Sequence, residues 1–150
     1  MRSVDVSTEI IINRPVEAVA AFASDPDNAT KWYVNIKSVA WKTPKPLVVG
    51  TQVEFMAAFL GKKLVYTYEV TEFSPNKNFV MRTANGPFPM ETTYHWQKIS
   101  DSQTRMVLRN RGTPSGFAKW ITPIMELAMK TANRKDLKRL KDLLEKDRTN

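Results

Sequence analysis

The sequence contains no cysteine and a single histidine, His95, among its 150 residues. Without cysteine the chain can form no disulfide, thiolate nucleophile or cysteine metal site, which fits a reducing, cytoplasmic compartment. One histidine cannot build a metal cluster, so we predict no metal site and no other cofactor. Because His95 is out of phase with the apolar alternation around it, we expect it to face solvent and not a substrate.

Motifs for nucleophilic or phosphate chemistry are also missing. The five glycines form no phosphate-cradling loop, and no nucleophile elbow accompanies the serines. No apolar run approaches the roughly 18 residues that span a bilayer, and residues 1–12 lack the basic start and continuous apolar run of a signal peptide. We therefore predict a cytoplasmic protein with no assigned catalytic residue and no transmembrane segment, and leave peripheral membrane contact open.

Positive charge is in excess, since 23 basic and 15 acidic residues give a net charge of +8. The basic residues are spread along the chain without a nucleic-acid motif, which argues against nucleic acid as the main partner. They concentrate only towards the C-terminus, where acidic residues interrupt them, and the simplest interpretation is the solvated face of a helix. This group comprises Lys130, Arg134, Lys135, Lys138, Arg139 and Lys141, interrupted by Asp136, Asp142, Glu145 and Asp147.

The composition, 42% hydrophobic and 25% charged, is that of an ordinary folded protein, and the length suits one domain over residues 1–150. Seven stretches alternate apolar and polar residues as half-buried strands do. Their short connections predict an antiparallel sheet, with two short helices at 16–23 and about 26–33, the second placing Trp32 against the core. The strand candidates are residues 4–12, 34–41, 51–60, 63–73, 79–83, 89–99 and 105–111.

Residues 115–148 predict a long helix, because apolar residues recur there at intervals of three and four. Pro123 lacks the N–H that an interior helical position donates, so we expect a helical segment before it, a kink, and a new start capped by Thr122. The helix should close the concave side of the curled sheet. Its expected apolar stripe includes Ile124, Met125, Ala128, Met129, Leu137, Leu140 and Leu144.

The order and spacing of several short motifs resemble the helix-grip superfamily SRPBCC, which includes START domains, birch-pollen-allergen-like proteins and polyketide cyclase/dehydrase-like proteins. The resemblance covers nearly the whole chain. It implies an α+β helix-grip fold, with a curved antiparallel sheet of about seven strands, two short helices and a long C-terminal helix across the concave face. The motifs are residues 12–19 (INRPVEAV), 22–28 (FASDPDN) with Lys31-Trp32, 49–51 (VGT), 69–75 (EVTEFSP), 104–107 (TRMV) and the region 135–145.

A small hydrophobic molecule is the expected partner, held in a cavity between the sheet and the long helix. Tyrosine and threonine hydroxyls lie among phenylalanines and methionines on the strand faces assigned inward, which suits an apolar pocket with a few polar anchors. An ordinary filled core would use the same residues, so both interpretations stay open at each position. The expected ligand-binding residues are Phe55, Phe59, Tyr66, Tyr68, Met81, Thr92, Tyr94, Met106, Met125 and Met129.

The favoured hypothesis is a non-enzymatic carrier or sensor of a lipid- or polyketide-like molecule. The first alternative is a polyketide cyclase/dehydratase-like enzyme that uses the cavity tyrosine hydroxyls and ordered water. It needs an acid or base with a perturbed pKa inside the cavity, and the sequence identifies none. The second alternative is an interaction module whose basic helix binds an acidic partner. The ligand and the oligomeric state stay open at this point.

Overall fold

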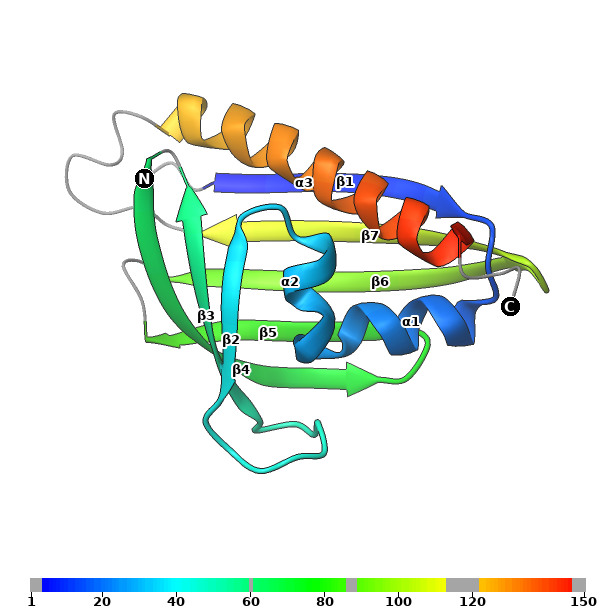
Figure 1. The fold of residues 1–150 in the computed structure, drawn as a ribbon, viewed down its shortest axis with the longest axis horizontal. Coiled ribbons are helices and arrows are strands. Elements are labelled where there is room, and N and C mark those ends of the chain that lie inside the picture. The colour runs from blue at the N-terminus through cyan, green and yellow to red at the C-terminus, as the bar shows by residue number, and fades with distance from the viewer. Residues whose placement is uncertain (1–3, 60, 86–88, 113–121, 147–150) are drawn as a thin grey trace.

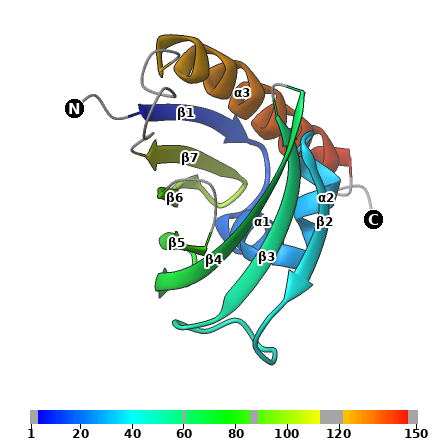
Figure 2. The same cartoon turned by 90° about the vertical axis from the view of Figure 1, so that its left-hand side faces the viewer.

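A computed structural model describes residues 4–59, 61–85, 89–112 and 122–146. Seven antiparallel strands form one sheet in the order β1-β7-β6-β5-β4-β3-β2, so the first and last strands of the chain are neighbours. The sheet curls into an open trough (Figure 1, Figure 2). The strands are β1 (Val4–Ile12), β2 (Ile36–Trp41), β3 (Gln52–Phe59), β4 (Lys62–Ser74), β5 (Asn78–Asn85), β6 (Met90–Ser100) and β7 (Gln103–Gly112).

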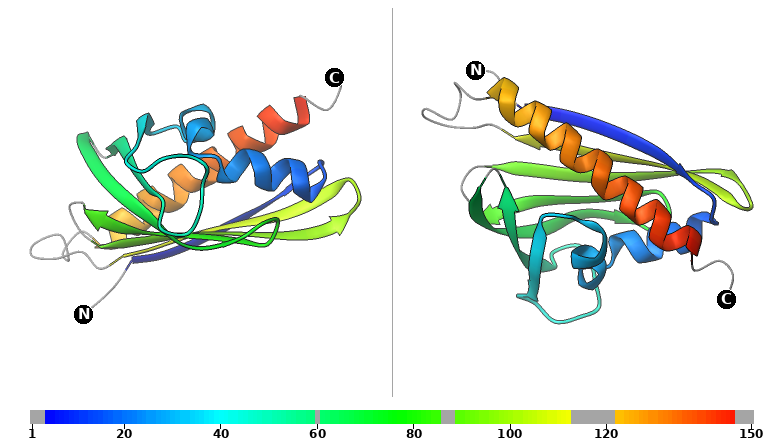
Figure 3. Two further views of the ribbon diagram at one scale, coloured as in Figure 1. Left: turned by 90° about the horizontal axis from the view of Figure 1, so that it is seen from below. Right: turned by 45° about the horizontal axis from the view of Figure 1, so that its top comes forward.

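The helices lie on the concave side of the sheet, as Figure 3 shows. α1 (Val16–Ser24), a short 3₁₀ helix η1 (Pro26–Asn28) and α2 (Ala29–Trp32) connect β1 to β2, and α3 (Thr122–Lys146) follows β7. The side chain of Asp25 caps η1 by accepting a hydrogen bond from the N–H of Asp27 at 3.0 Å. The prediction of a helix-grip fold with a seven-stranded antiparallel sheet is confirmed.

β4 gives the sheet its bend. Its pairing with β5 shifts register between Thr67 and Tyr68 and again between Val70 and Glu72. The first shift leaves Ala84 of β5 unpaired and the second leaves Thr71 of β4 unpaired. An extra residue bends its strand and increases the local twist, so the two halves of β4 run in different directions. In Figure 1, β2, β3 and the beginning of β4 therefore cross the direction of β5, β6 and β7. This bend leaves a hollow in front of the sheet.

One part of the hollow is filled by a packed core beneath α1, α2 and the C-terminal half of α3. Trp32 is fully buried, as predicted, and its ring packs edge-on against Tyr94 with 5.7 Å between the centroids. Burial of large apolar side chains supplies most of the stabilisation of such a core. The residues packed together here include Val16, Val19, Ala23, Phe79, Trp96, Met106, Leu108, Leu137, Leu140 and Leu144.

Hydrogen bonds to the connection between β1 and α1 hold the C-terminal end of α3. The guanidinium of Arg14 donates to the carbonyl of Leu144 at 2.7 Å, and the carboxylate of Glu145 accepts from the N–H of Asn13 at 2.8 Å. A cation at the last carbonyls of a helix also interacts favourably with the helix dipole. This end of α3 is therefore fixed to the sheet both by packing and by polar contacts.

The start of α3 departs from the sequence-based expectation at one residue. Pro123 lies in the first turn, where its missing N–H breaks no helical hydrogen bond, and the helical segment expected before it falls outside the described residues. Ile124, expected in the apolar stripe, is 61% exposed, so that placement is wrong. Neighbouring helix positions differ by about 100°, and Met125 occupies the inward direction instead.

Candidate ligand-binding site

A cavity of about 180 Å³ lies between the N-terminal half of α3 and the bent side of the sheet, and it is partly open to solvent. Most of its wall is apolar, with a few polar groups on α3, β6 and β7. Small-molecule sites in proteins have this character. Seven of the residues expected from the sequence line it: Phe55, Tyr66, Tyr68, Met81, Thr92, Met125 and Met129.

Strand alternation and pairing register bring the aromatic wall together. Phe55 of β3 pairs directly with Tyr66 of β4, and Tyr68 follows two positions later on the same face. The rings of Phe55 and Tyr68 meet edge-on with centroids 5.8 Å apart, and those of Tyr66 and Tyr68 are 5.9 Å apart. Mutual aromatic packing of this kind holds the wall in one arrangement.

The exposed fractions of the lining residues show where the cavity opens to solvent. Ala57, Leu64 and Met129 are partly exposed, whereas Met81 and Thr92 are buried. The cavity therefore opens between the β3–β4 side of the sheet and the N-terminal half of α3, and it deepens towards β5 and β6. Thr92 at the buried end donates a hydrogen bond to Oδ1 of Asn110 at 2.7 Å.

Three of the expected residues do not contribute a described side chain to the cavity. Tyr94 is 2% exposed and packs against the rings of Trp32, Phe79 and Trp96, and Met106 is fully buried in the same core. Both lie on the inward face, but beneath α1 and α2. They therefore line the core and not the cavity. Phe59 belongs to β3, and its side chain lies outside the described part of the chain.

The wall also contains polar residues that sequence reasoning missed. Asp136 interrupts the basic residues that were interpreted as the solvated face of α3, but it is itself 3% exposed and lines the cavity. Asn133 is 5% exposed and lines the cavity too. Their spacing could have predicted this, because Met129, Asn133 and Asp136 are three or four residues apart and lie on the same side of the helix as Leu140. The other unexpected lining residues are Tyr33, Asn35, Ile36, Ala57, Leu64, Met90, Asn110 and Ala132.

Asp136 is a carboxyl group with a strongly perturbed pKa. Its Oδ1 accepts a hydrogen bond from the N–H of Val34 at 2.8 Å. Burial raises the pKa of Asp136 from the ordinary 3.8 to about 7, although this hydrogen bond and the guanidinium of Arg139 both lower it. At neutral pH the cavity therefore contains a carboxyl group that is close to half ionised.

The tyrosine hydroxyls of the site stay neutral. The hydroxyls of Tyr33 and Tyr94 are 2.5 Å apart and form a hydrogen bond, and burial raises the pKa of both groups well above 10. Burial likewise raises the pKa of Tyr68, and that of Tyr66 to about 12. These groups can orient a ligand through hydrogen bonds, but they do not exchange protons readily near neutral pH.

Among the residues that the structure describes, no group of three or more histidine, cysteine, aspartate or glutamate side chains could hold a metal ion. His95 is exposed on β6, with its Nδ1 2.7 Å from Oδ1 of Asn78, so it faces away from the cavity, as its phase predicts. In the same described ranges, no helix combines the length and apolar character needed to cross a membrane.

Comparisons with known proteins agree with this architecture. A crystal structure of TTHA0849 from Thermus thermophilus superimposes with a TM-score of 0.81 at 20% identity, covering 93% of this chain and 96% of that one. The Zhui aromatase/cyclase from Streptomyces sp. R1128 gives 0.81 at 12% identity over 96% and 94%. A START superfamily protein from Mycobacterium smegmatis gives 0.79 at 14% identity over 95% and 97%. At these identities the likeness shows the fold.

No curated protein sequence matches the chain significantly. A family model does match, over residues 3–145, and its description is polyketide cyclase / dehydrase and lipid transport. The match spans every strand and nearly all of α3. The SRPBCC resemblance of its motifs agrees with the fold that it shares with the START superfamily protein. The chain therefore belongs to the polyketide cyclase / dehydrase and lipid transport family.

Proposed function

We propose that the protein is a carrier or sensor that binds a small, mostly apolar molecule in the cavity between α3 and the sheet. The observation that supports this most directly is the wall itself, which is apolar and aromatic with a few polar side chains at its buried end. A cavity of this kind gains affinity from burial of apolar ligand surface and orientation from its polar groups. The family description includes lipid transport, which agrees with a binding role.

The volume of the cavity limits the ligand that it can enclose. An apolar cavity of about 150 Å³ is enough to bind benzene, and this cavity is about 180 Å³. A molecule with one ring would fit inside, and a longer one would extend through the opening beside Leu64 and Met129. Burying about 200 Å² of apolar surface contributes about 5 kcal/mol before the costs of association. We therefore expect submillimolar affinity at best for a single-ring hydrocarbon.

Ethylbenzene is a suitable probe, and Ala57→Leu is the variant that tests the site. Ala57 lines the cavity near its opening, so three extra carbon atoms there should occupy ligand volume and weaken binding at least about tenfold by titration calorimetry. Ala58→Leu is the matched control, because Ala58 is the exposed neighbour on the opposite face of β3. No binding to the unmodified protein, or equal binding to both variants, would contradict the proposal.

A second candidate function is catalysis, and Asp136 is the observation that favours it. General acid–base catalysis works best when the pKa of the group lies near the working pH, and burial raises the pKa of Asp136 to about 7. The tyrosine hydroxyls, with their raised pKa values, would orient the substrate. On this proposal Asp136 would take a proton from a carbon beside a ketone, or return one to a leaving hydroxyl, during ring closure of a polyketone.

Turnover of a short poly-β-ketone, followed by the absorbance of the aromatic product, tests the enzymatic alternative. Asp136→Asn should abolish turnover while ethylbenzene still binds, because the amide keeps the shape of the side chain and loses the proton-transfer group. Asp142→Asn removes the same charge from an exposed position of α3 and should have no effect. Undetectable turnover in the unmodified protein would leave the binding function as the sole role of the cavity.

A further inference from the structure

Asn133 carries an amide nitrogen that nothing in the described part of the chain satisfies. Its side chain is 5% exposed, it lines the cavity, and its Nδ2 has no hydrogen-bond partner. Buried polar groups in folded proteins are nearly always paired, and an exception calls for an explanation. Because this donor is at the cavity wall, a bound molecule that offers an acceptor would satisfy it.

Asp136 lies three residues further along α3, on the same side of the helix, and also lines the cavity. Oδ1 of Asp136 accepts a hydrogen bond from the N–H of Val34 at 2.8 Å, whereas Oδ2 accepts none from the residues that the structure describes. Asn133 and Asp136 therefore present one unused donor and one unused acceptor to the same end of the cavity.

Most other polar groups around this pair are already engaged with one another. The hydroxyls of Tyr33 and Tyr94 bond each other at 2.5 Å, and Thr92 donates to Asn110 at 2.7 Å. The charged and titratable groups that act on Asp136 are Arg139 on α3, and Tyr33 and Tyr94 from the chain packed against it. The pair on α3 is thus a part of the wall that has both a donor and an acceptor left over.

We propose that Asn133 and Asp136 select a ligand that carries a neutral hydroxyl group on a small apolar body, such as a single-ring phenol. This rests on the proposed binding function of the cavity. Nδ2 of Asn133 donates to the hydroxyl oxygen, and the hydroxyl proton is donated to Oδ2 of Asp136. A hydrocarbon leaves both groups unpaired, and a carboxylate meets the negative charge of Asp136 with little water to screen it.

Three probes of nearly the same shape separate these cases: 4-ethylphenol, ethylbenzene and 4-ethylbenzoate. Each is titrated calorimetrically into the full chain at pH 8, where Asp136 is mostly ionised because burial raises its pKa to only about 7. We expect 4-ethylphenol to bind at least about tenfold more tightly than ethylbenzene, and 4-ethylbenzoate not to bind measurably. This comparison uses the unmodified protein, so it does not depend on whether any variant folds.

Two variants assign the selectivity to its residues. Asn133→Leu should reduce the preference for 4-ethylphenol over ethylbenzene to within about threefold, because the donor is replaced by apolar surface. Asp136→Asn removes the charge, retains an oxygen for the N–H of Val34, and should admit 4-ethylbenzoate. Asp142→Asn is the matched control: it neutralises an exposed acid on the same helix and should leave all three affinities unchanged.

Each outcome bears on a different claim. If ethylbenzene and 4-ethylphenol bind equally well, the selection of a hydroxyl group is contradicted while the apolar binding function stands. If the Asp136→Asn protein folds and still does not bind 4-ethylbenzoate, the proposed role of Asp136 in ligand selection is also contradicted. If none of the three probes binds, the proposed binding function fails, and this inference fails with it.

Discussion

Asp136 is a carboxyl group held where water scarcely reaches it, and the stability of the protein should depend on pH for this reason. Its pKa rises from 3.8 to about 7 on folding, so between these values the folded state binds more protons than the unfolded state. The free energy of unfolding should therefore fall as the pH rises from 4 to 7, and the loss from this group should be complete above 7. The shift corresponds to at most about 4 kcal/mol.

Asp136→Asn should remove most of this dependence. The variant should be more stable than the unmodified protein at pH 8, by about 2 to 4 kcal/mol, and similar to it at pH 4. Urea unfolding at both values measures the difference. Asp142→Asn, at an exposed position, should show no comparable gain. Equal stability of the Asp136→Asn and unmodified proteins at pH 8 would show that the burial of this carboxyl group is not unfavourable.

The two halves of α3 differ in how they are attached to the sheet. The C-terminal half buries Leu137, Leu140 and Leu144 and is bonded to the chain after β1, whereas Ile124 and Leu127 near the start are 61% and 68% exposed. Local opening is easiest where few apolar contacts hold an element. Amide hydrogen exchange should therefore be faster over residues 124–131 than over residues 137–145, by about tenfold or more.

A bound ligand should reduce this difference, because Met125 and Met129 line the cavity from the less anchored half. Saturating 4-ethylphenol should slow exchange over residues 124–131 and leave residues 137–145 nearly unchanged. Peptide-level exchange with mass spectrometry resolves the two segments. Uniform protection along the whole helix would show instead that α3 opens as a single unit.

Arg14 provides a direct test of the anchor at the other end. Arg14→Ala removes the hydrogen bond to the carbonyl of Leu144 and a cation at the helix C-terminus, and should lower the free energy of unfolding by about 1.5 to 3 kcal/mol. Arg134→Ala, at an exposed position of the same helix, should change it by less than about 0.5 kcal/mol. Urea unfolding at pH 7 compares the two variants. Similar effects would mean that the anchor contributes little.

Much of this arrangement could be predicted from the sequence, because strand alternation has a period of two and reports which face a side chain occupies. The alternation correctly placed Tyr66, Tyr68 and Thr92 on the concave face. It could not predict that Thr92 lines the cavity whereas Tyr94, two residues later on β6, lies in the core, because the part of the sheet that α1 and α2 cover depends on packing between distant segments. Asp136 was missed because an acidic residue among lysines and arginines has the composition of a solvated helix face.

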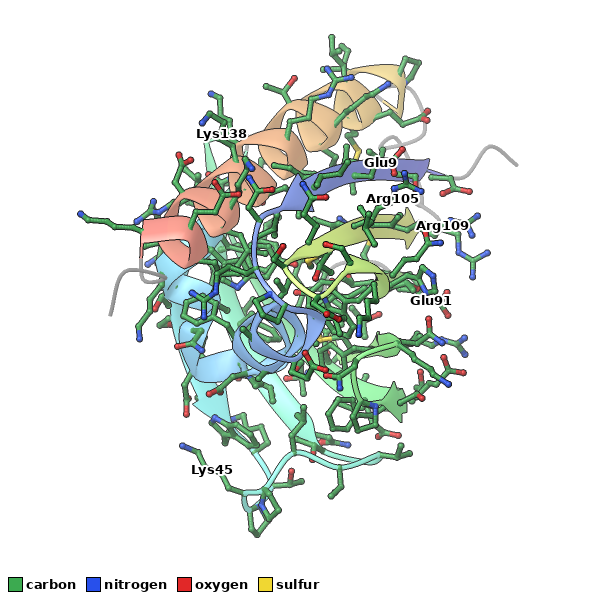
Figure 4. All side chains as sticks on the ribbon, turned by 90° about the vertical axis from the view of Figure 1, so that its right-hand side faces the viewer. Glu9, Lys45, Glu91, Arg105, Arg109 and Lys138 are labelled. Atoms are coloured by element: carbon green, nitrogen blue, oxygen red, sulfur yellow. The ribbon has the colours of Figure 1, made fainter. Side chains whose placement is uncertain are left out.

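The charge of the whole molecule is distributed unevenly between its faces. On the face of the sheet turned away from the helices, Arg109 is paired with Asp5 at 2.7 Å and Arg105 with Glu9 at 3.3 Å (Figure 4). Glu91 on the same face is paired with both Arg82 and Arg111. On the exposed side of α3, by contrast, Lys130, Arg134 and Lys135 form no ion pair with any residue that the structure describes. Part of the net charge of +8 therefore lies uncompensated along the exposed side of α3.

This distribution predicts weak, salt-dependent binding of polyanions to α3 that is independent of the cavity. If three cations engage a short DNA duplex, the affinity should fall about 40-fold between 50 and 200 mM salt, while ethylbenzene binding stays constant. Replacing Lys130, Arg134 and Lys135 by glutamine should abolish the duplex binding, as measured by fluorescence anisotropy.

Replacing Arg105, Arg109 and Arg111 by glutamine is the control, because it changes the net charge equally. It should weaken duplex binding less, since those cations are already neutralised by their partners. Equal losses from the two sets would mean that net charge alone attracts the polyanion, and the basic side of α3 would then be only the solvated face of the helix.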